Sequence, residues 1–325
     1  MRNKIILPIL HSTFIRGLNT SVDVLSKPIK LNPWYIGGFT DGEGSWGLSV
    51  SKDSKRSTGY NLSPKFTIGV HKVDIALLER IKVYFGVGNI YYGPGNLVRY
   101  QVTSLEELIT VIIPFFDKYP LVSQKRADFL LFKEIIVLLK NKEHLTRSGL
   151  DKVINIKAAL NTGNSDTLKE SFPAISPVAR PLVVFEGIPD PHWLTGFTDA
   201  DGCFFISIYD SPKSKLGLAV QLSYIVTQHI RDKELLEGIS TYLGCGRCSL
   251  RKEAGDFKVV SVADIIKKII PFFKEYQLQG VKRLNYNDLC EAAEIMKTKR
   301  HLTEAGLNEL KLIKSGMNTG RDYGK

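Results

Sequence analysis

The sequence predicts an α+β fold made of two copies of one domain, each a four-stranded antiparallel sheet backed by helices. Three observations lead to this prediction. Blocks of residues recur at a nearly constant spacing, apolar and polar residues alternate after each recurring acidic block, and a proline-rich segment separates the copies. The length of 325 residues is enough for two domains with cores of their own.

The internal repeat consists of four blocks that recur in one order. A solenoid would have a period of roughly 20 to 50 residues, so an offset of 157 or 158 residues indicates two copies of a whole domain. The matching blocks are residues 38–44 and 196–202, 74–79 and 232–237, 112–116 and 269–273, and 144–163 and 301–320.

Prolines mark the junction between the two copies. Phe172–Pro181 holds three prolines in ten residues, which is typical of an extended linker. Together with the repeat, this segment divides the chain into an N-terminal extension, a first domain, a linker and a second domain. The expected bounds are 1–29, 30–165, 166–187 and 188–325.

The N-terminal extension has the composition of a targeting segment. Arg2, Lys4 and Arg16 lie among Ile, Leu, Ser and Thr, and no acid precedes Asp23. This pattern is typical of a mitochondrial transit peptide, so we expect a mitochondrial location. A remnant of an upstream fused reading frame is the alternative.

Each half is expected to form an αββαββα unit, related to the other by a pseudo-twofold axis. The first helix should span residues 33–43, with Asn32 as its N-cap and Pro33 in its first turn. Its counterpart should begin near Asp190–Pro191. Alternation at the period of a strand follows each helix, and Pro64 within one such strand fits an edge or bulge position.

The charge of the chain indicates a polyanionic partner. Lys and Arg number 44 against 33 Asp and Glu, which gives a net charge of +11. Such an excess favours nucleic acid or an anionic membrane surface. The chain has no apolar run of the roughly 18 residues that span a bilayer, so double-stranded DNA is the expected partner and a membrane is not.

The polar face of each sheet offers positions that could read bases. A curved antiparallel sheet can lie in the major groove and present alternate side chains to base edges. Basic residues in the loops between strands, such as Lys55 and Lys213, would contact phosphates instead. The candidate base-reading residues are Ser49, Ser51, Asn61, Ser63, Lys65, Thr67, Arg99, Gln101, Ser207, Tyr209, Gln221, Ser223, Arg247, Ser249, Arg251 and Lys258.

The recurring acidic block carries the chemistry. Each copy places an acid, Glu43 or Asp201, at the expected C-terminus of its first helix, where it opposes the helix dipole. Glycines such as Gly38 and Gly196 would let the two helices approach closely and bring these acids together. Paired oxygen ligands without soft donors suit Mg²⁺, or Mn²⁺, so both acids are expected to be catalytic metal ligands. The alternative is that they are ordinary surface residues at helix ends.

Two other patterns have a structural interpretation and a chemical one. Cys245 and Cys248 have the spacing of half a zinc site, but no second pair follows, and a tight turn is the preferred interpretation. His144 and His301 recur, but each stands two residues before a Thr that would cap a helix, so a catalytic role is not the preferred interpretation.

At the segments 34–44 and 193–202 the sequence resembles the two signature helices of LAGLIDADG homing endonucleases. The likeness covers about residues 30–325 and is strongest to the fungal mitochondrial, intron-encoded group. It implies two sheets forming a saddle over one duplex, a monomer with internal pseudo-dimer symmetry, and cleavage of both strands with 3′ overhangs. It also implies that the final acid of each motif, Glu43 and Asp201, holds metal, and that Gln228 lies near the attacking water.

The chain departs from that pattern in two respects, because Asp201 is shorter than the usual Glu, and Ser104 and Ser261 stand where relatives carry Lys or Arg. The basic group of the site is therefore unassigned. The first half has Val70 at the place that matches Gln228.

Two alternatives to the endonuclease stay open at the sequence level. One is an RNA maturase, which uses the same fold to assist splicing of a group I intron and would bind intron RNA. The other is a duplicated DNA-binding regulator without activity, which has no use for the paired acids.

Overall fold

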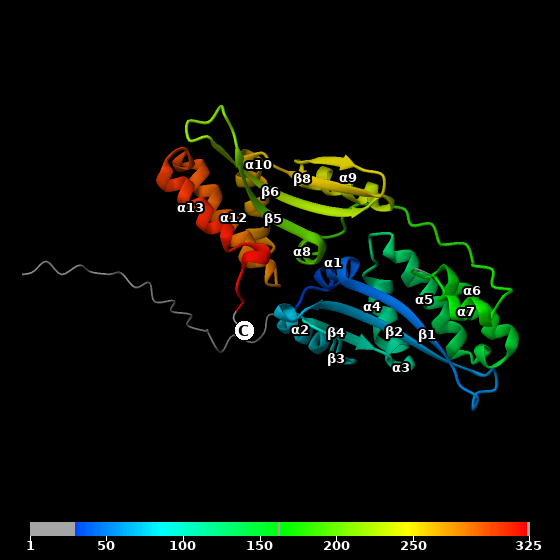
Figure 1. Ribbon diagram of the computed structural model, residues 1–325. Coiled ribbons are helices and arrows are strands. Elements are labelled where there is room, and N and C mark those ends of the chain that lie inside the picture. The colour runs from blue at the N-terminus through cyan, green and yellow to red at the C-terminus, as the bar shows by residue number, and fades with distance from the viewer. Residues whose placement is uncertain (1–29, 162, 324–325) are drawn as a thin grey trace, which may run out of the picture.

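The computed structural model describes residues 30–161 and 163–323, so the expectation for residues 1–29 lies outside the described part. Two lobes meet at a central pair of helices, and an extended segment crosses from one lobe to the other (Figure 1). The expected α+β architecture of two antiparallel sheets with helices is confirmed. Within the described residues, no helix is both long and apolar enough to span a membrane.

The elements of the first half follow the expected order. They are α1 (Pro33–Glu43), β1 (Gly44–Lys52), β2 (Tyr60–His71), η1 (Lys72–Asp74), α2 (Ile75–Phe85), β3 (Asn89–Tyr92), β4 (Leu97–Val102), α3 (Leu105–Glu107), the π-helical turn η2 (Leu108–Ile112), α4 (Ile113–Lys118), α5 (Lys125–Lys140), η3 (Glu143–Leu145), α6 (Arg147–Ala159) and α7 (Asp166–Ser171).

Within the described residues, the second half repeats this order as far as the equivalent of α6. Its elements are α8 (Pro191–Asp201), β5 (Gly202–Asp210), β6 (Leu218–His229), η4 (Ile230–Asp232), α9 (Lys233–Leu243), β7 (Arg247–Leu250), β8 (Ala254–Val259), α10 (Val262–Asp264), the π-helical turn η5 (Ile265–Ile269), α11 (Ile270–Glu275), α12 (Lys282–Lys297), η6 (Arg300–Leu302), α13 (Glu304–Ser315) and η7 (Asn318–Gly320).

Both central helices begin as the sequence predicts. The Asn32 side chain accepts a hydrogen bond from the Trp34 amide at 2.8 Å, and the Asp190 side chain accepts one from the His192 amide at 2.7 Å. A proline follows each cap, where its missing N–H leaves no helical hydrogen bond unmade.

The two sheets have the same strand order, β1-β2-β4-β3 and β5-β6-β8-β7, and every pairing is antiparallel. Pro64 pairs with Leu48 of β1, but β4 pairs with β2 only from Phe66 onward. The other side of β2 is therefore open at Pro64, which is the edge position expected for a residue without an N–H.

One face of each sheet is covered by helices and forms a core. In the first half Trp46 of β1 packs on Phe66, Phe116 and Phe132, with ring centroids 4.5 to 5.4 Å apart. The second half builds the same layer around Phe204. The opposite face of each sheet carries the polar side chains.

Helices α1 and α8 touch backbone to backbone. A Cβ atom added to Gly38 would lie 1.9 Å from the Trp193 carbonyl oxygen, and one added to Gly196 would lie 2.0 Å from the Tyr35 carbonyl oxygen. Only glycine fits at this distance, so these two residues set how closely the copies approach.

Four hydrogen bonds cross between the copies in reciprocal pairs. The indole of Trp193 donates to Asp41 at 2.8 Å, and the hydroxyl of Tyr35 donates to Asp199 at 2.7 Å. The Val281 amide donates to Asp74 at 2.8 Å, and the Gln124 amide, its symmetry mate, donates to Asp232 at 2.7 Å. Each copy thereby caps the helix start of the other, at α12 and at α5.

The last recurring block has a structural role. Asn161 and Asn318 adopt the left-handed conformation, with φ of 51° and 52°, just after α6 and α13. Their side-chain amides donate to the carbonyls of Trp46 and Phe204 on the first strand of each sheet. The asparagines thus bind the last helices of each copy to its sheet.

The segment expected to be an extended linker begins with a helix. Leu168 of α7 and Phe172 after it are buried against Leu150 and Ile154 of α6. Further on, Arg180 forms a bidentate ion pair with the buried Asp128, with N–O distances of 2.8 and 2.7 Å. The segment between the copies is therefore attached to the first copy as far as Arg180, while Phe185 further along packs on the core of the second.

The glycine contact between the copies can be tested by adding one methyl group. Gly38→Ala should lower the free energy of unfolding by about 1–3 kcal/mol or more, because the new Cβ meets rigid backbone. Gly37→Ala is the matched control, since its Cβ would lie 3.8 Å from the Trp193 ring, which is ordinary contact. Urea unfolding of the two variants measures the difference, and equal stabilities would contradict the proposed close packing.

Candidate functional site

The two candidate catalytic acids are the last residues of the central helices. Glu43 ends α1 and Asp201 ends α8, and both are half-buried. A Cβ atom added to Gly42 would lie 2.2 Å from the Ala200 Cβ and 3.0 Å from a carboxylate oxygen of Asp201. The helix ends therefore meet, and the structure brings the two acids together as the sequence predicts.

The electrostatics at this point favour a cation. The pKa of Glu43 is raised to about 7, first by burial and then by the negative charge of Asp201, while Lys282 and Lys125 lower it. Both carboxylates also stand at helix C-termini, where the peptide dipoles add negative potential. All these effects are relieved when a positive ion binds between the acids.

Two lysines that lie beside the acids were not among the predicted site residues. Lys125 donates to the Gly42 carbonyl at 2.5 Å, and Lys282 donates to the Ala200 carbonyl at 2.8 Å. Burial lowers the pKa of each lysine, and the nearby carboxylates, Glu43 and Asp201 among them, raise it again. A signal was present, because the Lys-Arg pairs 125–126 and 282–283 recur at an offset of 157 residues.

Ser104 and Ser261, which stand where relatives carry a basic residue, lie just after β4 and β8. Both serines are N-caps, of α3 and α10, and accept hydrogen bonds from Glu107 and Asp264. The lysines that contact the ends of α1 and α8 are Lys125 and Lys282, the first residues of α5 and α12.

Gln228 lies beside one of the two acids. Its side-chain amide donates to Asp201 at 2.7 Å from near the end of β6. The equivalent residue of the first half, Val70, is buried in the core of that copy. The site is therefore asymmetric, with an amide beside one acid only.

The donors at the helix ends fit a hard divalent cation. They are the carboxylate oxygens of Glu43 and Asp201, and such ions prefer oxygen. The described residues contain no group of three or more His, Cys, Asp or Glu side chains suited to a metal. Glu43 and Asp201 would be the protein ligands, and the other coordination positions would be left to water and substrate oxygens.

The recurring histidines and the paired cysteines lie elsewhere. His144 is in η3, beyond the far end of α5, and the 16 residues of that helix span about 24 Å from Lys125. His301 has the same place after α12, and Thr146 and Thr303 are helix N-caps as expected. Cys245 and Cys248 flank Gly246, which has a positive φ of 85°, so they border a tight turn.

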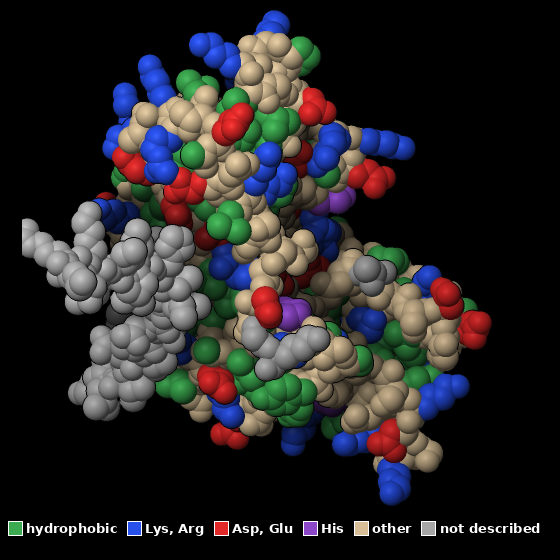
Figure 2. Space-filling model, turned by 60° about the vertical axis from the view of Figure 1, so that its left-hand side comes forward, with side chains coloured by type: hydrophobic (Ala, Val, Ile, Leu, Met, Phe, Trp, Pro, Cys, Tyr) green, Lys and Arg blue, Asp and Glu red, His purple; other side chains and the backbone are tan. Residues whose placement is uncertain are grey.

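The strand registers place the candidate base-reading residues on one face of each sheet. Ser49 pairs with Ser63, and Thr67 pairs with Gln101. In the second half Ser207 pairs with Gln221, and Arg247 with Lys258. Arg251 lies just after β7, in the turn before β8. Figure 2 shows Lys and Arg side chains spread over both lobes of the visible face.

One of these candidates is corrected by the structure. Ser223 is only 1% exposed, and its hydroxyl has no hydrogen-bond partner among the described residues. Its cross-strand partner is Phe205, where the first half has Gly47, and the longer Gln221 and Ile225 flank it on the same face. These neighbours cover the serine, so it does not reach a base from this position.

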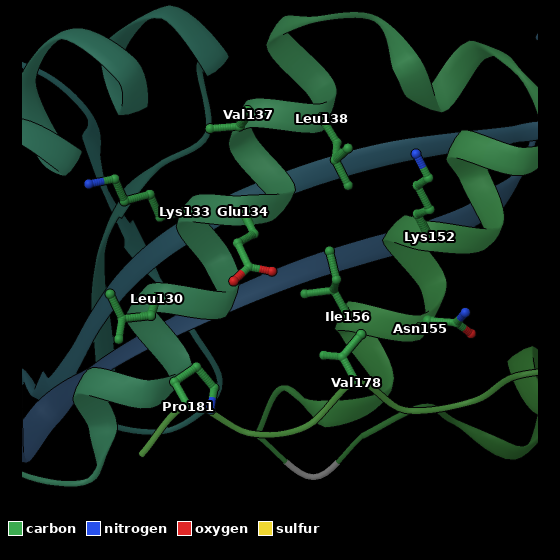
Figure 3. A pocket seen from close by; sticks show the side chains of 10 residues that line it. All are labelled: Leu130, Lys133, Glu134, Val137, Leu138, Lys152, Asn155, Ile156, Val178 and Pro181. Carbon is green, nitrogen blue, oxygen red and sulfur yellow. The ribbon is translucent and has the colours of Figure 1, made fainter. Parts of the chain in front are cut away.

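An apolar groove lies away from the acids, on the helical side of the first copy. Figure 3 shows Leu138 of α5 and Ile156 of α6 pointing toward one another, and Leu130, Val137 and Val178 also line the groove. None of its lining residues belongs to the polar sheet face or to the pair of acids.

The fold and the site define a two-copy α+β protein in which each copy contributes one acid to a central helix pair. The chain belongs to the LAGLIDADG endonuclease family, whose model matches residues 36–136 and 194–293. It is 43% identical to the I-SmaMI LAGLIDADG homing endonuclease solved with cleaved DNA, with a TM-score of 0.88 over 90% of this chain and 98% of that one. The likeness to I-LtrWI bound to target DNA has 48% identity and a TM-score of 0.87, over 89% and 98% of the chains.

Two curated relatives are intron-encoded proteins of one fungus. The "Probable intron-encoded endonuclease 3" of Neurospora crassa is 37% identical over 293 residues, which are 89% of this chain and 55% of the relative. A second protein of that fungus, "Probable intron-encoded endonuclease 2", is 35% identical over 88% of this chain and 65% of its own length. The chain therefore spans less than two thirds of these relatives.

The raised pKa of Glu43 predicts a gain in stability when its charge is removed. Glu43→Gln should unfold at a higher urea concentration than wild type at pH 8. Its free energy of unfolding should be greater by up to about 3 kcal/mol, because wild type must ionise a buried carboxyl above pH 7. Wild type recovers this stability as the pH falls from about 7 to 4.5, so the difference should vanish there.

The exposed Glu79→Gln is the control and should match wild type throughout. A Glu43→Gln protein that is less stable than wild type at pH 8 would show that the carboxylate is not destabilised by its surroundings.

Proposed function

We propose that the chain is a site-specific homing endonuclease that hydrolyses both strands of a long double-stranded DNA target and leaves 3′ overhangs. It uses a divalent metal, Mg²⁺ or Mn²⁺, and acts as a monomer with internal pseudo-dimer symmetry. The observation that carries the proposal is the meeting of Glu43 and Asp201 at the ends of α1 and α8, between two polar sheet faces. Relatives whose names state DNA cleavage or bound DNA support it.

The two sheets would hold the duplex and the helix ends would cut it. The polar faces of the copies present side chains to the major groove, and loop residues such as Lys55 and Lys213 contact phosphates. Because the copies are fixed by the glycine contact between α1 and α8, the acids would face the two strands at one place along the duplex. Positioning of this kind supplies much of the rate of phosphodiester hydrolysis.

The residues of the site divide the chemical work. Glu43 and Asp201 would hold the metal, which when bound polarises the phosphodiester and stabilises the leaving 3′-oxygen. Gln228 donates one amide hydrogen to Asp201, which leaves its side-chain carbonyl to orient the attacking water. Lys125 and Lys282 place positive charge beside the acids and stabilise negative charge that develops on the phosphate.

The place of action is proposed to be the mitochondrion. The named relatives are intron-encoded fungal proteins, and the basic N-terminal segment agrees with import. The proposed homing activity places the DNA target in the copy of the host gene that lacks the intron.

Removal of one carboxylate charge should stop the reaction without removing the binding surface. Glu43→Gln is expected to reduce double-strand cleavage by at least a hundredfold while its affinity for the target stays within about tenfold, because the substitution keeps shape but loses a metal ligand. Cleavage of plasmid with Mg²⁺ and binding with Ca²⁺ measure the two effects. Cleavage at the wild-type rate at saturating Mg²⁺ would remove Glu43 from the site.

The asymmetry of Gln228 predicts a difference between strands. Gln228→Val, which copies the residue of the first half, should slow cleavage of one strand by about a hundredfold and leave the other within severalfold. Single-turnover cleavage of supercoiled plasmid, with each strand labelled separately, should show accumulation of nicked circles. Equal slowing on both strands would assign Gln228 to folding or binding instead.

A further inference from the structure

A network of three side chains stands on the polar face of the second sheet. Arg251 donates to a carboxylate oxygen of Asp256 at 2.7 Å, and the Thr227 hydroxyl donates to the same oxygen at 2.7 Å. The Asp256 side chain is 23% exposed, whereas that of Arg251 is 58% exposed. The acid is therefore the inner member, and the guanidinium faces outward.

The network lies near the catalytic acids. Thr227 directly precedes Gln228, which contacts Asp201, and the turn that carries Arg251 is bound to the end of β6 by a hydrogen bond from the Ile230 amide to the Glu253 carbonyl. A base contacted from here would lie toward the middle of the target rather than at its outer end.

The first copy has a different set of residues at the same places. In the registers Gly69 pairs with Arg99 as Thr227 pairs with Asp256, and Gly93 occupies the position of Arg251. The first copy therefore has Arg99 at the position of Asp256, and glycines at the positions of Thr227 and Arg251. The sign of the charge at the central position is reversed between the copies.

A guanidinium that is held in one orientation discriminates better between bases. Arginine recognises guanine through two parallel hydrogen bonds to O6 and N7, which require a defined orientation of the fork. A free side chain must lose rotamer entropy to adopt that orientation, whereas one already held by a carboxylate loses less on binding. Arg251 uses one terminal nitrogen for Asp256 and keeps further N–H groups for a ligand.

We propose that Asp256 is a positioning residue that holds Arg251 for reading one guanine in the half of the target bound by the second copy. Arg99 reads the symmetry-related position in the other half without such support. The target is then not palindromic at this pair of positions, and discrimination is sharper on the side of the second copy. The inference rests on the proposed function, because it needs a duplex on the polar sheet faces.

The test compares base preferences of variants on a randomised duplex library. Wild type, Arg251→Ala, Asp256→Ala and the double variant are used to select bound duplexes in Ca²⁺, and each recovered base pair is then substituted singly in cleavage assays with Mg²⁺. Lys252→Ala is the matched control, since it removes a positive charge from the same exposed turn and leaves the Asp256 network intact.

The expected result is a change at one base pair. Arg251→Ala should reduce discrimination for guanine there by about tenfold to a hundredfold, the range of a good bidentate contact. Asp256→Ala should reduce discrimination at the same base pair, and the double variant should be no worse than Arg251→Ala. Lys252→Ala should weaken all sequences alike, as expected for a phosphate contact.

Three outcomes would overturn the inference. Asp256→Ala could change a different base pair from Arg251→Ala, which would mean that the acid itself reads a base such as cytosine. Asp256→Ala could weaken every sequence equally, which would make it a structural residue. Arg251→Ala could leave every preference unchanged. Failure of wild type to select or cut any duplex is distinguishable from these, because it would contradict the proposed function itself.

Discussion

The backbone contact between α1 and α8 is the constraint on which the rest of the structure depends. Because Gly38 and Gly196 carry no side chain, each helix lies against a carbonyl of the other, and the two C-termini are forced to meet. That meeting produces the pair of acids, sets the separation of the two sheets and brings the starts of α5 and α12 within reach of the opposite copy. A side chain at either glycine would move all of these together.

The site is assembled against the preference of its own charges. Two carboxylates at neighbouring helix ends repel each other and oppose both dipoles, and the raised pKa of Glu43 expresses that cost. Lys125 and Lys282 offset part of it by binding the last carbonyls of the two helices. The negative potential that remains between the two acids attracts a positive ion. This attraction makes the arrangement suitable for metal-assisted chemistry.

The fold and the meeting of the two acids could be predicted from the sequence, because local patterns that occur twice indicate both. The caps at Asn32 and Asp190, the alternation along the strands and the recurring acidic block depend on neighbouring residues. Lys125 and Lys282 were missed although they also recur, since only the three-dimensional path of α5 and α12 brings them to the helix ends.

Other features depend on contacts that a repeat does not reveal. The burial of Ser223 depends on the bulk of Phe205 across the sheet, and the attachment of the linker depends on Arg180 finding Asp128 more than fifty residues away. Alternation predicted which face Ser223 belongs to but not how far its neighbours would extend. Individual base contacts are even harder to predict from the sequence, because they depend on the curvature of each sheet and on the shape of the DNA.

The reciprocal capping across the seam also bears on how the molecule comes apart. The start of α5 is held by Asp232 and that of α12 by Asp74, so loss of either lobe would leave a half-buried amide of the other without its acceptor. The aromatic donors to Asp41 and Asp199 would be lost in the same event. Each lobe therefore depends on the other for these hydrogen-bond partners, so the seam couples the stability of one lobe to the presence of the other.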